Sequence, residues 1–321
     1  MELLTPSQLP RAAHLLKQGK LVAFPTETVY GLGAGIFHPE SIQSIFAVKA
    51  RPSDNPLIAH VCALSQLEQI AEEIPASFYL LARHFIPGPL TVILKRRSHV
   101  PPLVSAGLPT IAVRMPSHPL ALQLIEQVGE PLVAPSANLS GKPSATQAKH
   151  VLEDFEGKIA AVLDGGATEF GIESTVLNLL GDVPLLMRPG AVSKEAIEAV
   201  LGYEIGVASA DLSGPVASPG MKYRHYSPRT QIQVFYHWEE LLSAIIQGLP
   251  GATMLLCRRS LQAPITGVDP FFLSVKEFYS LLRLADAQNY QQIVIFCDEG
   301  VCKEAALMNR IVRASATYKS Q

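Results

Sequence analysis

Glycines, cations and short hydroxyl side chains gather in five clusters within the first 190 residues of this chain. The first cluster begins near Thr28, directly after an apolar run, and continues with Gly31, Gly33 and Gly35. Closely spaced glycines let the backbone approach a ligand and present amide N–H groups to anionic oxygens. A phosphate cradle is one interpretation of this stretch. An ordinary turn is the other, because the glycines do not continue as G-x-G-x-x-G.

Two further clusters carry cations. Lys49 and Arg51 stand just before Pro52, and Arg114 ends an apolar run. Lysine as a point charge and arginine as a bidentate donor are the usual protein partners of a polyphosphate. A helix end whose dipole favours cations is the alternative for Lys49 and Arg51. An arginine at a strand end requires a carboxylate, and the protein supplies one more often than a ligand does.

The last two clusters are rich in hydroxyl and amide side chains, and each adjoins a strand-like run. Their polar members are Ser136, Asn138, Ser140, Lys142, Ser144, Glu173, Ser174 and Arg188. Short hydroxyl donors beside free backbone amides are typical of phosphate and nucleobase sites. The sequence contains no nucleophile elbow, no H-E-x-x-H and no G-x-x-x-x-G-K-[ST]. It therefore favours chemistry by positioning and charge stabilisation, such as displacement at phosphorus.

Short apolar runs that alternate with amphipathic segments predict an α/β or α+β fold in which these clusters lie at strand ends. The strands are expected at residues 21–24, 90–94, 111–113, 132–134, 161–163 and 175–179. A helix around Ile42 to Phe46 should end near Arg51 because Pro52 follows. A second helix, residues 118–128, should be capped by Gly129.

The pattern predicts two domains joined by a Ser-Gly-Pro-rich segment, with boundaries at residues 1–206, 207–229 and 230–321. The third segment follows a β-α-β-α-β-α order, which a small parallel, Rossmann-like sheet with right-handed crossovers satisfies. Its strands are expected at 232–235, 254–257 and 293–297, and its helices at 238–246, 278–287 and 303–314. No glycine-rich phosphate turn follows any of these strands.

Composition excludes several classes of function. A net charge of -2 gives no global field for nucleic acid or an anionic membrane. The four cysteines, Cys62, Cys257, Cys297 and Cys302, are too few for a disulfide scaffold and lack zinc-type spacing, so they are expected to be reduced core residues. No apolar run approaches the ~18 residues of a membrane span, and no signal peptide is evident. We expect a cytoplasmic protein without membrane contact.

Four motifs, in order and spacing, resemble the YrdC-type threonylcarbamoyl-adenylate synthases in their longer, two-domain form. They are Pro25 to Gly33, Lys49-Ala50-Arg51, Ser136-Ala137-Asn138 and His225-Tyr226-Ser227-Pro228. The resemblance covers essentially the whole chain. It implies a large YrdC-like twisted-sheet domain with flanking helices, followed by an interdomain loop that closes over the site and a small Rossmann-like domain.

The resemblance also implies an activity, that of a nucleotidyltransferase. L-Threonine, bicarbonate or CO2, and ATP would give L-threonylcarbamoyl-AMP and pyrophosphate. Downstream threonylcarbamoyl transferase proteins would then modify adenosine in ANN-decoding tRNAs, so contact with tRNA would be only indirect. Mg²⁺ is expected with the nucleotide, but no set of carboxylates fixes it and no metal ligand is assigned.

The same resemblance implies site residues. The threonine set is Thr28, His60, Arg114, Ala134 and Ser174, with Arg114 holding the amino-acid carboxylate. The ATP set is Lys49, Arg51, Asn55, Thr110, Ser136, Asn138, Ser144, Arg188, Tyr223, Arg224 and His225, and among these Lys49 and Arg51 would be catalytic. Tyr223, Arg224 and His225 could close the pocket as a lid or belong to a passive linker.

Two other functions stay open at this point. One is a non-catalytic RNA-binding module, which would need a broad basic surface, whereas the chain has 26 basic against 28 acidic residues. The other is a carbamoyl transferase that uses carbamoyl phosphate without threonine.

Overall fold

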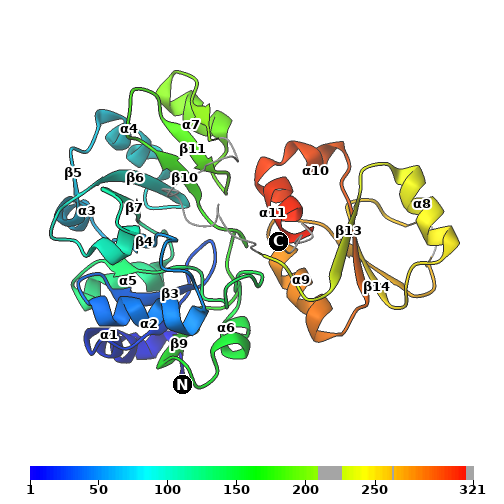
Figure 1. Cartoon of the computed structure of the whole chain (residues 1–321), viewed down its shortest axis with the longest axis horizontal. Coiled ribbons are helices and arrows are strands. Elements are labelled where there is room, and N and C mark those ends of the chain that lie inside the picture. Colours follow the sequence, from blue (N-terminus) through cyan, green and yellow to red (C-terminus); the bar gives the residue numbers. More distant parts are fainter. Residues whose placement is uncertain (209–225, 262–263, 316–321) are drawn as a thin grey trace. The chain divides into compact units, whose positions relative to one another are not determined.

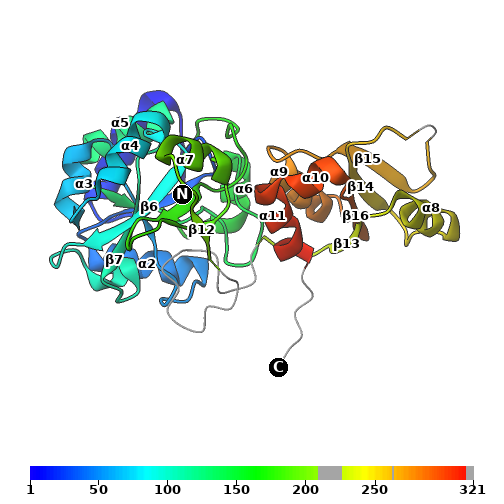
Figure 2. The same cartoon turned by 90° about the horizontal axis from the view of Figure 1, so that it is seen from above.

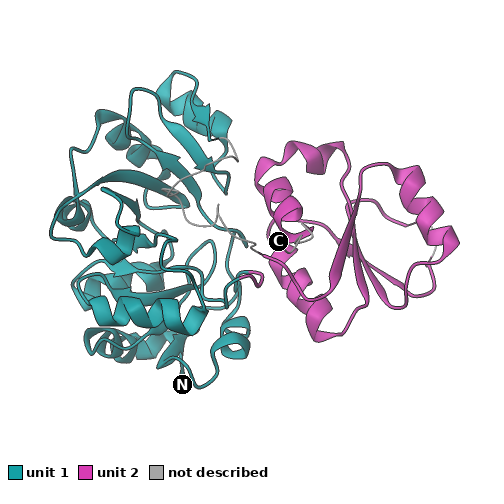
Figure 3. Ribbon diagram, viewed as in Figure 1, with its two compact units in different colours: residues 1–140, 144–223 teal, residues 141–143, 224–321 magenta. Residues whose placement is uncertain are grey.

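A computed structural model describes residues 1–208, 226–261 and 264–315. The chain divides into two units, one comprising Met1–Ser140 and Ser144–Tyr223, the other Gly141–Pro143 and Arg224–Gln321 (Figure 3). Most of the predicted connecting segment, and with it Tyr223, Arg224 and His225, lies outside the described residues.

The first unit is built on one twisted mixed sheet (Figure 1). In spatial order its strands are β1 (Glu2–Leu4), β9 (Ala161–Leu163), β2 (Val22–Phe24), β3 (Gly31–Gly35), β8 (Leu132–Val133), β4 (Ile58–His60), β7 (Thr110–Arg114), β6 (Leu90–Arg96), β10 (Thr175–Asn178), β11 (Leu185–Arg188) and β12 (Gly206–Val207), and β5 (Ala71–Glu72) pairs with β6. Its helices are α1 (Leu9–Lys17), α2 (Pro39–Lys49), α3 (Leu64–Ile70), α4 (Ala76–Phe85), α5 (Pro119–Val128), α6 (Ala148–Phe155) and α7 (Lys194–Leu201), with short 3-10 turns at Pro6–Gln8 and Pro102–Ser105.

Alternation along the strands divides the core between the two faces of this sheet. Val22 and Phe24 of β2 pack with α1 and α5, whereas Leu21 and Ala23 join the larger core beneath α2, α4, α6 and α7. Helices α1 and α5 lie side by side (Figures 1 and 2). They cover β1, β9, β2 and β8. The same face of the sheet continues over β4, β7, β6 and β10, where it carries a smaller apolar cluster. The members of this cluster are Ile58, Ala112, Ile93, Val176 and Met187.

Most predicted elements of the first unit are confirmed. The strands predicted at 90–94 and 161–163 are β6 and β9, and α5 ends at Gly129, whose φ of 87° is the left-handed cap conformation that glycine favours. Helix α2 ends at Lys49, and Ala50 takes a left-handed φ of 49°.

The glycine-rich stretch differs from the prediction of a turn. It forms β3, which pairs antiparallel with β2 and with β8. The glycines are needed for close packing, because a Cβ on Gly33 would lie 2.8 Å from a ring carbon of Phe24 and one on Gly31 would lie 3.1 Å from the Cβ of Ala134.

The second unit contains a four-stranded parallel sheet, and the predicted α/β class with a small parallel sheet is confirmed. Its strands in spatial order are β13 (Gln231–Phe235), β16 (Gln292–Phe296), β14 (Thr253–Cys257) and β15 (Val268–Phe272). Helix α8 (Trp238–Gln247) lies on one side of this sheet, and α9 (Phe278–Ala287) and α11 (Ala305–Ser315) lie on the other (Figure 1). The short helix α10 (Glu299–Lys303) precedes α11.

Two details of the second unit differ from the sequence prediction. Strand β15 was not expected, because Asp269 and Pro270 interrupt its apolar pattern, yet an edge strand tolerates a proline. The helix expected at 303–314 is present as α11 but begins at Ala305, since Glu304 leaves helical geometry with φ -84° and ψ 85°. Within this unit Arg283 donates to the carbonyl oxygen of Pro143 at 2.7 and 3.1 Å.

Candidate active site

Three polar residues form one row across neighbouring strands of the first unit: His60 and Arg114, which were predicted site residues, and Thr91, which was not. His60 on β4 is the register partner of Arg114 on β7, which in turn is the partner of Thr91 on β6. Side chains in one row point to the same face, and His60 also pairs with Leu132, which packs under α5. The row therefore lies on the face that α1 and α5 cover elsewhere, where all three side chains are buried.

Each strand of the row also carries an apolar residue on the same face, next to its polar member. Ile58, Ala112 and Ile93, two residues away from His60, Arg114 and Thr91, lie on the same face and form an apolar floor. The polar row thus has low-dielectric surroundings, in which charges and hydrogen bonds act strongly.

Arg114 is held by the protein through all three of its nitrogens. Nε donates to the carbonyl oxygen of Gly88 at 3.2 Å, Nη1 to Thr28 Oγ1 at 2.8 Å and Nη2 to Glu27 Oε1 at 2.6 Å. The ion pair is buried, with side-chain exposures of 4% for Arg114 and 2% for Glu27. A protein carboxylate therefore partners Arg114, and two of its five N–H groups, one on each terminal nitrogen, have no partner among the described residues.

The hydroxyl of Thr28 belongs to a short chain of hydrogen bonds. Thr26 Oγ1 donates to the carbonyl oxygen of Val29 at 2.6 Å, so in the 2.9 Å contact between the two threonine hydroxyls Thr28 is the donor. Thr28 then accepts from Arg114, and the chain runs from the guanidinium to the backbone.

The ionisation of the buried groups follows from their surroundings. Burial alone would raise the pKa of Glu27, but the charge and hydrogen bond of Arg114, together with smaller contributions from the backbone amides of Glu27 and Ser117, outweigh it and the pKa is lowered overall. Burial, helped by the charge of Arg114, lowers the pKa of His60 to about 3. His60 is therefore neutral at neutral pH, and because Nδ1 lies 3.2 Å from the carbonyl oxygen of Ile58, Nδ1 carries the proton and Nε2 is an acceptor.

Ser174 and Arg188 come together at the far end of the row. Thr91 Oγ1 and Ser174 Oγ are 2.7 Å apart. Arg188 donates to the carbonyl oxygen of Ser174 at 3.0 and 3.2 Å and contacts its hydroxyl at 3.3 Å. Ser144 donates to the carboxylate of Glu173, which brings the end of the hydroxyl-rich loop beside Ser174.

Lys49 organises the beginning of that loop. Its buried ammonium group donates to the carbonyl oxygen of Ser136 at 2.6 Å and to that of Asn138, and the amide of Ser140 donates to the carbonyl oxygen of Lys49 at 2.9 Å. The loop also reaches the first cluster, since Ala137 N donates to Tyr30 O at 2.7 Å.

The predicted residues on or near β4 and β7 lie in two groups, one at each end of these neighbouring parallel strands. His60 and Arg114 end these strands. Arg51 donates to the carbonyl oxygen of Pro56 at 2.9 Å and contacts that of Asn55, both just before β4, and Thr110 begins β7. Because four residues of strand span about 13 Å, Thr110 and Arg51 do not touch the His60–Arg114 pair. Such a separation suits an extended ligand rather than a single small one.

Sequence reasoning did not single out Glu27 or Thr91, and it named Glu173 only as a member of a polar cluster, without a role. Glu27 and Glu173 adjoin the predicted residues Thr28 and Ser174, and that adjacency was the available signal. Thr91 lay inside a correctly predicted strand, but only the pairing of β6 with β7 shows that it belongs to the row. Ala134 follows β8 with its side chain in the core and its amide bonded to Ile58 O at 3.0 Å.

The described residues hold no cluster of three or more His, Cys, Asp or Glu side chains that could bind a metal ion. Nor does any helix among them have the length and apolarity to cross a bilayer.

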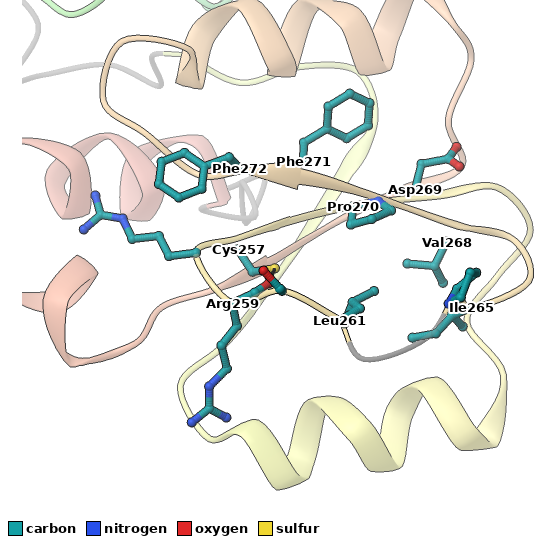
Figure 4. A pocket seen from close by; sticks show the side chains of 12 residues that line it. Cys257, Arg259, Leu261, Ile265, Val268, Asp269, Pro270, Phe271 and Phe272 are labelled. Atoms are coloured by element: carbon teal, nitrogen blue, oxygen red, sulfur yellow. Dashed lines mark hydrogen bonds between the residues drawn. The ribbon is translucent and has the colours of Figure 1, made fainter.

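A separate pocket of about 700 Å³ lies in the second unit at the end of β14 (Figure 4). Its two cations already have protein partners, because Arg258 pairs with Glu304 at 2.8 Å and Arg259 lies 4.9 Å from the ring centre of Trp238. None of the predicted site residues lines it.

Comparison with known proteins identifies two family models along the chain. The Sua5/YciO/YrdC family model, described as "Telomere recombination", matches residues 14–190, and the model of the threonylcarbamoyl-AMP synthase C-terminal domain matches residues 192–316. The threonylcarbamoyl-AMP synthase of Bacillus subtilis is 48% identical over 242 residues, which are 75% of this chain and 70% of that protein. The Schizosaccharomyces pombe enzyme is 39% identical, with 97% of this chain and 89% of that protein covered.

A solved structure extends the similarity to the whole fold. The crystal structure of Pyrococcus abyssi Sua5 complexed with L-threonine is similar to this chain with a TM-score of 0.89 and 39% identity, covering 98% of both chains. The resemblance inferred from the four motifs is thereby confirmed. The chain belongs to the Sua5/YciO/YrdC family, in the two-domain form that carries the threonylcarbamoyl-AMP synthase C-terminal domain.

Proposed function

We propose that this chain is an L-threonylcarbamoyladenylate synthase, which forms L-threonylcarbamoyl-AMP and pyrophosphate from L-threonine, CO2 or bicarbonate, and ATP. The observation that carries the proposal is the buried row of His60, Arg114 and Thr91, with two guanidinium N–H groups left over, in a chain whose relatives are threonylcarbamoyl-AMP synthases.

The row provides the amino-acid end of the site. Two N–H groups are what a carboxylate needs for a bidentate contact, and a buried arginine makes that contact strong. Thr28 is bonded to Arg114, His60 pairs with it on the neighbouring strand, and Ser174 is joined to the row through Thr91. These residues offer polar atoms for the amine and hydroxyl of threonine. L-Threonine bound to the related P. abyssi protein supports this assignment.

The second group of residues provides the nucleotide end. Lys49 fixes the loop of Ser136 and Asn138, and Arg51 and Thr110 lie toward the opposite ends of β4 and β7 from Arg114. Arg188 adds a cation beside Ser174, level with Arg114 along the strands. These cations would offset the charge of the triphosphate. Mg²⁺ would enter with ATP, bound chiefly by phosphate oxygens.

The reaction divides into two steps. The threonine amine adds to the carbon of CO2 and loses a proton, which gives a carbamate. A carbamate oxygen then attacks the α-phosphorus of ATP, the bond from that phosphorus to the bridging oxygen breaks, and pyrophosphate leaves. Positioning and charge stabilisation are the contributions that the site's residues offer to this displacement. A buried site would also keep water from the unstable carbamate.

The product is an activated acyl group, so a downstream transferase must consume it. We propose that this acceptor pathway modifies adenosine in ANN-decoding tRNAs, with tRNA bound by the transferase proteins rather than by this chain.

The test is pyrophosphate release from ATP with threonine and bicarbonate supplied together or singly. We expect release only with both, and a product whose mass increases by one unit when ¹³C-bicarbonate is used. ATP turnover that is unchanged without threonine would overturn the proposal. Consumption of carbamoyl phosphate without threonine would favour a carbamoyl transferase, and tight tRNA binding without turnover would favour an RNA-binding module.

A further inference from the structure

The two carboxylate oxygens of Glu27 differ in their hydrogen bonding. Oε1 accepts from Arg114 Nη2 at 2.6 Å, and the side chain is 2% exposed. Oε2 is fully buried and has no donor in hydrogen-bond geometry among the described residues, although the backbone amides of Glu27 and Ser117 lie near the carboxylate and help to lower its pKa. A buried carboxylate oxygen without a donor is costly, and native proteins seldom leave one without a purpose. A ligand donor would remove that cost.

The neighbours of Glu27 make a cationic donor the best match. Among the residues that the structure describes, Arg114 is the one cation bonded to it, and the histidines that interact with it electrostatically are His60 on β4 and His118 at the N-cap of α5. Burial lowers the pKa of both imidazoles, so both favour the neutral form. His118 Nδ1 accepts from Leu120 N at 3.2 Å, and His60 offers Nε2 as an acceptor. Two hydrogen-bond acceptors, Oε2 of Glu27 and Nε2 of His60, thus lie near the guanidinium group of Arg114.

An amino acid is a zwitterion, so its site needs donors for the carboxylate and acceptors for the ammonium group. Arg114 has two N–H groups for the first task. Oε1 of Glu27 fixes Arg114, and Oε2 belongs to the same rigid carboxylate, so the donor and the acceptor are held as one unit. The α-carboxylate and α-ammonium groups are likewise joined through one carbon.

We propose, on the basis of the synthase function above, that Glu27 binds the α-ammonium group of the amino-acid substrate through Oε2 while Oε1 holds Arg114 for the α-carboxylate. Glu27 is therefore a specificity residue for the amine, beyond the threonine and ATP sets inferred from the sequence. It makes the site select amino acids over hydroxy acids of the same shape.

The experiment compares two ligands by calorimetry on the full chain. L-Threonine and 2,3-dihydroxybutanoate share the carboxylate, the side-chain hydroxyl and the methyl group, and differ in the amine. The wild type should bind threonine more tightly. Glu27→Gln should reduce the ratio of the two affinities about tenfold or more, the effect of losing one charge-assisted hydrogen bond. A purely structural role through Arg114 would weaken both ligands alike and leave the ratio unchanged, which would overturn the inference.

A control variant and the wild type itself distinguish failure of the inference on Glu27 from failure of the proposed synthase function. Glu130→Gln removes another ion-paired carboxylate of the same unit, 3.1 Å from His38 and outside the site, and should leave both affinities unchanged. A wild type that binds no threonine would reject the synthase function together with the inference, whereas an unchanged ratio rejects the inference alone.

A second measurement needs no variant and remains decisive if Glu27→Gln does not fold. The ¹⁵N chemical shift of labelled threonine reports whether its amine is protonated. A carboxylate acceptor should make the bound amine titrate at higher pH than the free amino acid. Titration at lower pH than in the free amino acid would contradict the assignment.

Discussion

The ammonium group of Lys49 donates to the main-chain carbonyl oxygen of Ser136 over 2.6 Å, from the last residue of α2 to a loop 87 residues later in the chain. The same group also donates to the carbonyl oxygen of Asn138. A buried cation thus fixes the loop that we assign to the nucleotide, and its charge remains beside the place where a polyphosphate would bind.

Replacing this cation should therefore affect both stability and nucleotide binding. In Lys49→Met the aliphatic stem is kept, but two buried carbonyl oxygens lose a charged donor, which should lower the free energy of unfolding by about 1–3 kcal/mol. ATP affinity, measured by titration, should fall by an order of magnitude, since two effects combine. Lys158→Met, at an exposed position, should change neither quantity. Unaltered ATP affinity in the folded Lys49 variant would remove Lys49 from the nucleotide site.

Arg114 should control the other substrate. Arg114→Ala removes the two N–H groups assigned to the threonine carboxylate, so the KM for threonine should rise by about tenfold or more while that for ATP changes little. The loss leaves Glu27 as an unpaired buried charge, so the free energy of unfolding should also fall, by about 3–5 kcal/mol. Arg51→Ala is the matched comparison and should affect chiefly ATP. If the two variants changed both KM values alike, the division of the site into two ends would be wrong.

Local pattern was sufficient to predict most of the elements that frame this site. The β-branched and apolar residues of β6 and the four-residue spacing in α5 define these elements within a few positions of the chain. Strand β3 was not predictable in this way. Its glycines signal a turn locally, and only the ring of Phe24 on the neighbouring strand explains why glycine is required there.

The partnerships within the site could not be predicted from local pattern. Glu27 and Arg114 are separated by 87 positions, and Thr91 and Ser174 by 83. Such pairs depend on strand order and register, which a single sequence does not specify. The sequence favoured a protein carboxylate as the partner of Arg114, and the motif resemblance made Arg114 a ligand-binding residue, but neither indicated that the carboxylate is that of Glu27.

Neutral His60 should make the fold sensitive to acid. Burial and the charge of Arg114 lower its pKa to about 3, whereas an unfolded histidine titrates near the ordinary value of 6.5. Below pH 6.5 the unfolded chain therefore binds a proton that the folded chain does not, so stability falls as the pH decreases, by at most ~1.4 kcal/mol per pH unit for this one group. Stability is fully present above that range.

The variant His60→Gln isolates this contribution. Unfolding free energies measured by denaturant between pH 7 and 5 should decrease less steeply in the variant than in the wild type, because the carboxylates that begin to titrate near pH 5 are common to both proteins. Parallel curves for the two proteins would show that His60 is not held neutral in the folded state.

Gly190 should be intolerant of any side chain, because the backbone before β10 occupies the space. A Cβ at this position would lie 2.3 Å from Thr175 N, 2.4 Å from the carbonyl carbon of Ser174 and 2.6 Å from the carbonyl oxygen of Glu173. Backbone atoms cannot rotate away as a side chain can, so Gly190→Ala should shift Ser174 and its bonds to Arg188 and Thr91. We expect a loss of stability of about 1–3 kcal/mol. Binding of both substrates should weaken, because Ser174 belongs to the threonine set and its partner Arg188 to the ATP set. Gly300→Ala is the control, since its Cβ would meet nothing closer than 3.3 Å and alanine favours the helix α10. Thermal unfolding and paired threonine and ATP titrations would check both variants, and a Gly190→Ala protein with wild-type affinities would show that Ser174 has no part in binding.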